Sequence, residues 1–304
     1  MTVLSLDFWV LVLAGALASA TPIVLAGLGE TVLQRAGQFN LGIEGIMICG
    51  ALAGVLGSAA AGPFAGAGFG VLAGVLLGFV FALGCLAGID VVLVGVALTM
   101  LGVGVSTFVF QSWVPSGRTN LSVPTLPAMS VPGLSQLPGI GPLFSSIGVL
   151  TYAAGALAVL TWWVLRWTRF GLRIRAVGDS PDVAAVRGVP VSRYRAVAAL
   201  IAGGFAGLAG AALSLSAIGS FSPGMSGGRG FIALAVVVVA RRAPLGVLAG
   251  ALLFAVPDSL GLLGQTRDTG LPVEALHALP YLVTFVVVCF ESRHRMRLRQ
   301  DTAI

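Results

Sequence analysis

The sequence has no lysine, and arginine supplies all 17 of its basic residues. The phosphate-binding loop of nucleotide hydrolases requires a lysine that reaches the phosphates, so we expect that this chain does not hydrolyse ATP. Its two histidines, His277 and His294, have no neighbours at metal-ligand spacing, and no Ser-His-Asp or Cys-His set lies in one place. The three cysteines lie far apart in apolar stretches and form no disulfide or metal pattern. We therefore expect no catalytic residue, no metal site and no cofactor.

Charge is also scarce. Charged residues make up 9% of the chain and hydrophobic residues 57%, with a mean hydropathy of +1.02, whereas soluble domains carry about 25% charged residues. The composition predicts an all-α, polytopic integral membrane protein that lies in a lipid bilayer. The net charge of +6 is concentrated in two arginine-rich patches, which indicates membrane topology and no nucleic-acid partner.

The apolar runs predict about nine spans in a single transmembrane domain, residues 1–304. The first run, Phe8–Leu28, has no basic lead-in, so we expect a true span and not a signal peptide. Phe231–Ala240 is too short to cross a hydrocarbon core of about 30 Å, so we predict a short or broken helix near residues 229–240, preceded by irregular backbone inside a cavity. The other spans are Ile46–Ala61, Phe64–Ala87, Val91–Phe110, Ser146–Leu165, Ala196–Ile218, Leu245–Leu263 and Ala275–Phe290.

Two loops set the predicted orientation. The loop over residues 111–145 is rich in proline and carries one charge, Arg118, which is typical of the outer side. The loop over residues 167–195 belongs to a stretch with seven arginines between Arg166 and Arg195, which the positive-inside rule assigns to the cytoplasm. When loop 111–145 is placed outside and loop 167–195 in the cytoplasm, 14 of the 17 arginines lie on the cytoplasmic side. The N-terminus is then predicted outside and the C-terminus in the cytoplasm.

Glycines recur at intervals of four in one span, at Gly66, Gly70, Gly74 and Gly78. In a membrane helix, a stripe of small residues allows another helix to approach closely. We expect this stripe to be a packing surface without a chemical role.

Polar residues within or beside the spans are candidates for a substrate pathway, because intramembrane ionisable groups are costly and usually functional. The segment Gly29–Gly45 is too polar to face lipid, so we predict that it lies at the interface or in a protein-lined cavity. Glu30, Asp90 and Glu274 sit at predicted turns or span ends, where a structural role is the simpler interpretation. For Glu44 and Asp258, structural and pathway roles both stay open. The predicted pathway residues are Asn40, Glu44, Arg229, Phe231 and Asp258.

The segment Gly171–Arg195, GLRIRAVGDSPDVAAVRGVPVSRYR, contains a short helix with both ends marked. Ser180 fits the N-cap, Pro181 fits the first helical position, and Asp182 places negative charge at the positive end of the helix dipole. Arg187–Gly188 fits the end of the helix. A helix of about two turns is not stable alone, so the spans or a partner must hold it. A loop that merely carries positive charge is the alternative.

Three stretches, in this order, resemble the membrane permease subunits of bacterial ABC importers for nucleosides and simple sugars, with branched-chain amino-acid permeases as relatives. They are GETVLQRAGQFNLGIEGIMICGALAG, GLRIRAVGDSPDVAAVRGVPVSRYRAVAALIAGGFAGLAGAALSL and GRGFIALAVVVVARRAPLGVLAG. The resemblance covers nearly the whole chain. It departs from the family in the third stretch, where a glycine near Ala240 and a single basic residue are expected and the chain has Arg241 and Arg242.

The resemblance implies a non-catalytic transport subunit of the bacterial inner membrane. It implies a second permease subunit, an ABC ATPase subunit that docks on the cytoplasmic loop, and an external substrate-binding protein. It also makes Pro181–Arg187 the coupling helix. A branched-chain amino-acid ABC permease and a self-sufficient channel or ion-coupled transporter are the alternatives. The implied coupling residues are Gly178, Asp179, Ser180, Pro181, Asp182, Ala185, Arg187 and Gly188.

Overall fold

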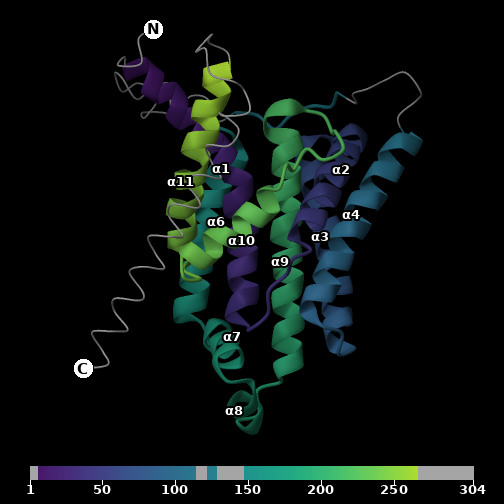
Figure 1. Cartoon of the computed structure of the whole chain (residues 1–304), viewed down its shortest axis with the longest axis vertical. Helices are drawn as coiled ribbons and strands as arrows, with labels where there is room; N and C mark the ends of the chain where they lie inside the picture. The colour runs from purple at the N-terminus through teal and green to yellow at the C-terminus, as the bar shows by residue number, and fades with distance from the viewer. Residues whose placement is uncertain (1–5, 114–121, 129–146, 266–304) are drawn as a thin grey trace.

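The computed structural model describes residues 6–113, 122–128 and 147–265, and these residues are mainly helical. Their β-structure is limited to one isolated bridge between Ala128 and Gly148. The long helices stand side by side in Figure 1, and their length and apolar composition confirm the prediction of an all-α, multi-pass membrane protein. Seven of them are long and apolar enough to cross a membrane: α1 (Leu6–Arg35), α2 (Ile43–Ala61), α3 (Pro63–Leu86), α4 (Val91–Trp113), α6 (Val149–Trp167), α9 (Val191–Leu213) and α11 (Pro244–Gln265).

Each of these helices corresponds to a predicted span, and α10 (Arg229–Val239) corresponds to the short helix predicted near residues 229–240. The last predicted span, Ala275–Phe290, lies outside the described residues, as does Glu274. The total of nine spans and the sides assigned to the two termini therefore stay predictions.

The first helix is longer than predicted. It continues from Leu28 to Arg35, so the first part of the polar segment Gly29–Gly45 is helical, and residues 36–42 connect α1 to α2. Gln34 donates a hydrogen bond of 3.1 Å to the Glu30 carboxylate one turn away. The Glu30 side chain lies inside the protein, where it avoids contact with lipid, although its second carboxylate oxygen has no hydrogen-bond partner among the described residues.

Glycine packing holds α2, α3 and α9 together. The four glycines of the predicted stripe are all buried on α3, which confirms their packing role. A Cβ on Gly207 of α9 would overlap the carbonyl oxygen of Gly70 and lie 2.8 Å from the Cα of Gly74. A Cβ on Gly50 of α2 would in turn lie 2.6 Å from the Cα of Gly207. The backbones of three helices therefore meet at Gly207 without a side chain between them.

Part of the predicted external loop is packed on the helix ends. Residues 122–128 lie against η1 (Ser214–Ile218), a turn of π-helix that continues α9. This part of the loop belongs to the folded bundle. Its backbone hydrogen bonds run from the amide of Val123 to the carbonyl of Gly219, at 2.7 Å, and from the amide of Leu126 to the carbonyl of Leu215, at 2.9 Å.

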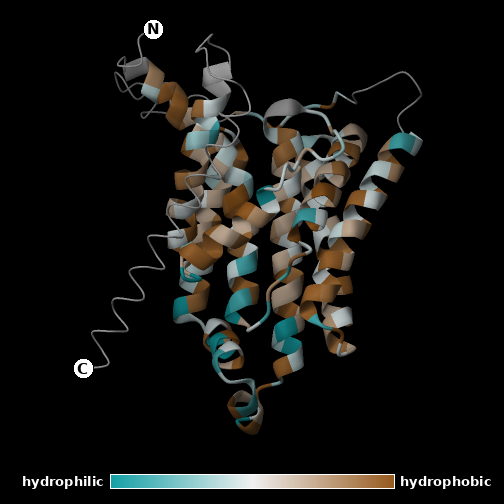
Figure 2. Ribbon diagram, viewed as in Figure 1, coloured by the Kyte–Doolittle hydropathy of each residue, from teal (hydrophilic) through white to brown (hydrophobic). Residues whose placement is uncertain are grey.

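Large apolar side chains cover the outer faces of α3 and α4. Leu72, Leu76, Met100 and Phe108 are 64% to 74% exposed, which is typical of a surface in contact with lipid. Polar residues gather instead at the lower helix ends and on α7 (Arg169–Asp179), as Figure 2 shows. The distribution separates an apolar belt from one polar end of the molecule.

Candidate functional site

A carboxylate from another helix holds the N-terminus of α10. Glu44, in the first turn of α2, accepts hydrogen bonds from the amide of Gly228, at 2.8 Å, and from the amide of Gly230, at 2.7 Å. The first amides of a helix have no partner within it and form the positive end of its dipole. Glu44 satisfies two of these amides and balances their charge. The contact needs glycine, because a Cβ on Gly230 would lie 2.6 Å from a carboxylate oxygen of Glu44.

Arg229 and Asp258 form an ion pair beside this cap. Their closest nitrogen and oxygen atoms are 3.6 Å apart, and the two side chains are 29% and 32% exposed. Arg229 also donates to the carbonyl of Met225 at 3.3 Å, which ties the preceding loop to α10. Since partly exposed pairs add little stability, the main effect is to orient α10 against α11. Asp258 follows Pro257, which lies inside α11 and cannot donate a helix hydrogen bond.

Residues 36–42 connect α1 to α2 through a turn that two polar side chains fix. The amide of Asn40 donates to Glu30 at 3.2 Å, and the Asn40 side chain accepts from the amide of Gly42 at 2.7 Å. Asn40 is buried and Glu30 is fully buried. Because this turn leads directly into α2, it determines where Glu44 meets α10.

All five predicted pathway residues lie at the beginning of α10 or in the elements that meet it there. Asn40 and Glu44 belong to the polar turn and to α2, Arg229 begins α10, and Asp258 reaches it from α11. Phe231 lies in the first turn of α10, with its side chain 48% exposed. Figure 1 shows α10 slanted across the upright helices near the middle of the bundle. The pathway role of these residues stays a prediction.

The arginine-rich segment forms two helices and not one. The sequence predicts α8 (Pro181–Val186) but misses α7, which precedes it. Ser180 occupies the N-cap position of α8, yet its side chain makes no capping hydrogen bond, contrary to the expectation. Thr168 provides such a cap for α7 and accepts from the amide of Gly171 at 3.1 Å. Both helices lie at the lower end of the molecule in Figure 1.

The ends of α8 otherwise follow the prediction. Asp182 lies in the first turn, Arg187 is the C-cap residue, and Gly188 has a φ of 76°, where glycine is favoured. Val183 and Val186 are 58% and 89% exposed, which gives this polar segment an apolar surface typical of a partner contact. The predicted coupling residues that are exposed are Asp179, Ser180, Asp182, Ala185, Arg187 and Gly188.

Gly178 joins α7 to the end of α1. A Cβ on Gly178 would overlap the carbonyl oxygen of Arg35 and lie 3.0 Å from the amide nitrogen of Gly37. Arg35 also donates through Nε to the carbonyl of Arg242 at 3.0 Å. The end of α1 is thus held by α7 and by the connection that follows α10. The 36–42 turn lies between the predicted coupling segment and the Glu44 cap.

A cavity of about 540 Å³ lies between this turn and α10. Apolar walls with a few polar groups are typical of small-molecule sites, and Gln34 and Gln38 supply side-chain amides here. The apolar lining residues are Phe39, Leu41, Leu234, Ala235 and Val238.

Two structural contacts are missed by sequence reasoning. Glu30 is predicted at a span end, but it lies inside α1 and anchors the polar turn; its spacing of four from Gln34 is a signal that could have placed it on the helix. Thr99 of α4 donates to the carbonyl of Leu41 at 2.9 Å. The two residues are 58 positions apart, and no local pattern links them.

The departure from the expected family pattern lies at the end of α10. Arg241 and Arg242 have φ values of 52° and 56°, in the left-handed region that favours glycine. The amide of Arg242 donates to the carbonyl of Val237 at 3.0 Å, which ends the helix. A glycine would make this stop without strain, whereas this chain places two arginines in it.

A multi-pass helical bundle, with the short helix α10 and a cavity beside a polar turn, fits the architecture of a membrane transport protein. Residues 12–288 match the family described as "Branched-chain amino acid transport system / permease component", and the chain belongs to this family.

Its relatives confirm the resemblance to permeases for nucleosides and sugars. The chain is 38% identical to a putative glucose ABC transporter permease protein of Haloferax volcanii, over 90% of this chain and 88% of the relative. It is 31% identical to a guanosine ABC transporter permease protein of Bacillus subtilis, over 91% of each chain. It has the same identity and coverage, 31% and 91%, with a nucleoside ABC transporter permease protein of Lactococcus lactis.

Proposed function

We propose that this chain is the permease subunit of an ABC importer and forms a translocation path for a nucleoside or a simple sugar. The observation that carries the proposal is the similarity, over 90% to 91% of the chain, to permeases named for glucose, guanosine and nucleosides. The chain acts as one transmembrane domain, residues 1–304, in the inner (plasma) membrane of a bacterium, with the N-terminus outside and the C-terminus in the cytoplasm.

The beginning of α10 supports a neutral substrate. Broken helices in transporters commonly offer their N-terminal amides to an anionic group of the substrate. Here the amides of Gly228 and Gly230 already bind the Glu44 carboxylate, so an amino-acid carboxylate would have to displace it. Nucleosides and sugars carry no such group. This arrangement favours them over a branched-chain amino acid.

The α7–α8 segment supports coupling to a separate ATPase subunit. The exposed Val183 and Val186 provide an apolar contact surface, and Gly178 transmits a displacement of α7 to the end of α1 through a backbone contact. ATP hydrolysis belongs to that partner subunit. A second permease subunit, identical or different, completes the path, and an external binding protein delivers the substrate.

Uptake assays in a strain that lacks this chain test the substrate class. Complementation with the wild-type chain is expected to restore uptake of a radiolabelled nucleoside or sugar. An excess of the same unlabelled compound is expected to compete with this uptake. Restoration of leucine uptake alone would instead support the amino-acid alternative.

Reconstitution separates an importer subunit from a self-sufficient channel. Vesicles that contain only this chain are expected to take up no substrate, whereas vesicles that also contain the ATPase, the second permease and the binding protein take it up when ATP is present. Uptake by the chain alone would contradict the proposal.

A further inference from the structure

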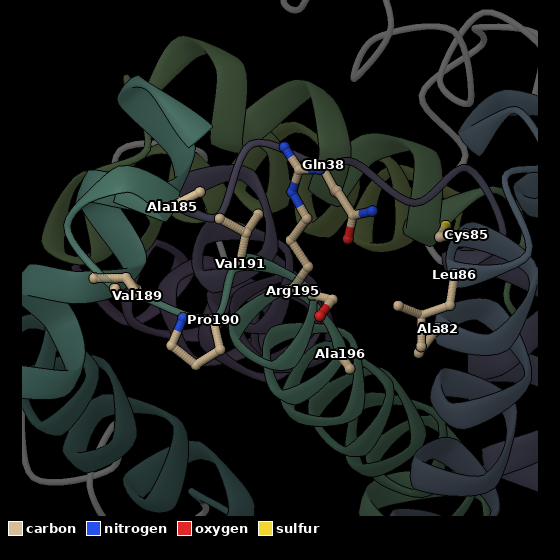
Figure 3. Close-up of a pocket in the computed structure, with 12 residues that line it drawn as sticks. Gln38, Ala82, Cys85, Leu86, Ala185, Val189, Pro190, Val191, Arg195 and Ala196 are labelled. Atoms are coloured by element: carbon tan, nitrogen blue, oxygen red, sulfur yellow. The ribbon is translucent and has the colours of Figure 1, made fainter. Parts of the chain in front are cut away.

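A second cavity, of about 720 Å³, lies between the end of α3, the α8–α9 connection and the start of α9. Figure 3 shows its lining from the last turns of α3, the connection between α8 and α9, and the polar turn. It shares Gln38 with the smaller cavity beside α10, and the ion pair and the cap of α10 take no part in it. Six of the residues that form it are Gln38, Ala82, Leu86, Val189, Ser192 and Arg195.

Arg195 supplies the positive charge of this cavity. Its Nε is buried and has no hydrogen-bond partner among the residues that the structure describes. The ion pair found within these residues joins Arg229 to Asp258, so Arg195 has no acidic counterpart there. The Nε is itself enclosed, so an external acceptor would bind the terminal guanidinium nitrogens of this half-buried side chain, for which no hydrogen bond is found among the described residues.

Two neutral donors stand beside the guanidinium. Figure 3 shows the side chains of Arg195 and Gln38 extending into the same space, and Ser192 lies one turn before Arg195 on the cavity wall. Within the described chain, the Gln38 side-chain amide makes none of the hydrogen bonds that hold the polar turn. The arginine, the amide and the hydroxyl together line the cavity with several hydrogen-bond donors.

The nearest acidic residue along α3 is already used elsewhere. Asp90, after the end of α3, accepts hydrogen bonds from the amides of Val92 and Leu93 at 2.9 and 3.3 Å, where it caps α4. Arg187 and Arg193 are exposed on either side of the α8–α9 connection. Asp90 keeps its negative charge and acts, like Arg195, on Cys85 of the cavity wall, but with Arg187 and Arg193 beside it positive charge predominates around the cavity, which attracts anions.

We propose that this cavity binds a phosphate-bearing anion, which is either the headgroup of an acidic phospholipid or a free phosphate. The planar guanidinium of Arg195 matches the geometry of phosphate oxygens, and Gln38 and Ser192 complete the donor set. The apolar part of the wall, around Ala82 and Leu86, accepts the carbon skeleton of a lipid headgroup. Leu83 and Leu86 are 49% and 54% exposed on α3, which places the cavity next to the lipid-facing surface.

An occupied cavity connects the predicted coupling helix to the membrane bundle. Ala185 and Gly188 form part of its wall together with residues of α3 and α9. A bound phosphate group would therefore restrain α8 relative to α3. This consequence depends on the proposed coupling function, whereas binding itself does not.

The first experiment measures lipid retention. The full-length chain is reconstituted in nanodiscs that contain phosphatidylcholine with or without phosphatidylglycerol, and native mass spectrometry counts the acidic lipids that stay bound. Arg193→Gln is the matched control, because Arg193 is exposed on the same helix and does not line the cavity. Wild type and Arg193→Gln are expected to retain phosphatidylglycerol, and Arg195→Gln is expected to bind it about tenfold more weakly, as the loss of a charge-assisted hydrogen bond implies.

The second experiment identifies a free-phosphate source. In nanodiscs of phosphatidylcholine alone, inorganic phosphate is compared with chloride at matched ionic strength. A rise of the Tm that occurs in wild type and Arg193→Gln but not in Arg195→Gln, without retention of phosphatidylglycerol, assigns the cavity to a free phosphate.

Gln38→Leu keeps the arginine and removes one neutral donor, so it decides the question if Arg195→Gln does not fold. It is expected to weaken binding in whichever experiment the wild type responds to. The proposal is overturned if the folded cavity variants retain phosphatidylglycerol and respond to phosphate to the same extent as Arg193→Gln, or if the wild type responds in neither experiment.

Discussion

Two regions of this permease are held together in opposite ways. At Gly207, the backbones of α2, α3 and α9 touch directly, and each contact depends on the absence of a side chain. At the beginning of α10, the elements are held by charged side chains from elsewhere in the sequence, namely Glu44 of α2 and Asp258 of α11. The glycine contacts cannot rearrange unless the helices separate. The beginning of α10 can move when a few hydrogen bonds break.

The difference shows how a membrane bundle combines a rigid part with an adjustable one. Without a hydrophobic driving force between helices in lipid, association relies on close packing and on polar contacts. The glycine contacts provide the close packing, in α3 and α9, and the carboxylate cap provides the polar contact, around α10. Substitutions in the two regions are therefore expected to have different effects. A change at the glycine contacts is expected to prevent folding, whereas a change around the start of α10 is expected to impair transport before it impairs folding.

The largest effect is expected from Gly207→Leu. The new side chain would meet the backbones of α2 and α3, which cannot shift without separating the helices, so a loss of about 3 kcal/mol or more in stability is expected. The measurement is the yield and Tm of monodisperse protein in detergent.

Gly68→Leu is the control for this change. Gly68 lies on α3 close to the buried stripe, but it is exposed, and a Cβ there meets nothing within 4 Å. This variant is expected to fold like wild type. Equal losses in both variants would mean that the glycine contacts do not hold the three helices together.

The next effect is expected from Glu44→Ala. It leaves the amides of Gly228 and Gly230 without their acceptors, and a hydrogen bond to a charged group contributes about 1.5–3 kcal/mol. We expect faster hydrogen exchange at the start of α10 and a strong fall in uptake, with most of the bundle intact. Glu44→Gln keeps one carbonyl acceptor and is expected to recover part of both losses.

Asp258→Asn provides the comparison within the same region. It removes one charge from a partly exposed pair, which contributes little to stability, so the fold and the protection of α10 are expected to stay close to wild type. Unchanged exchange at α10 in Glu44→Ala would contradict the role of the cap.

A smaller change in stability is expected from Asp182→Arg in the predicted coupling helix. It reverses a favourable interaction with the helix dipole, of about 0.3–1 kcal/mol, and it alters the surface offered to the ATPase. The bundle is expected to stay folded, while the assembled transporter hydrolyses ATP with reduced uptake. Asp182→Asn, which removes the charge without reversing it, is the matched control. Unchanged uptake and unchanged ATPase association in Asp182→Arg would leave coupling through α8 unsupported.

The smallest effect, and one of opposite sign, is expected from Arg242→Gly. Glycine relieves the left-handed backbone at a φ of 56°, and it keeps the carbonyl that Arg35 binds. Part of the gain is offset by the greater freedom of the unfolded chain, so the net stabilisation is expected to be no more than about 1 kcal/mol. Arg193→Gly, in the first turn of α9, is expected to cost up to about 1 kcal/mol instead. Thermal shifts of equal sign in the two variants would contradict this reading of the α10 stop.

The spans and the glycine stripe were predictable because both depend on composition and short spacing. The bounds of α1 were not, because polarity at Glu30 and Gln34 resembles a loop unless the burial of these side chains is known. Tertiary packing also decides which glycine of α3 contacts which glycine of α9. The spacing of residues within one helix does not specify that pairing.

The residues of the candidate site could be predicted from the sequence, but the contacts between them could not. Charge in an apolar context identifies Glu44, Arg229 and Asp258, yet nothing local indicates that Glu44 caps a helix 184 residues away. Sequence capping rules place Ser180 at the start of α8, but its side chain makes no cap hydrogen bond there. Such long-range partners follow from the fold and cannot be read from spacing.

The backbone contact at Gly207 limits the ways in which this protein can move. A side-chain interface can adopt new rotamers, but a contact between backbones has no rotamer to exchange. For α9 to slide along α3 to the next equivalent position, the repeat of four residues would require a translation of about 6 Å. The glycine repeat therefore fixes the position of α9 along α3, and we expect α2, α3 and α9 to move together as one rigid body. Relative motion in a transport cycle is then expected at the junctions of this unit with α10 and α11.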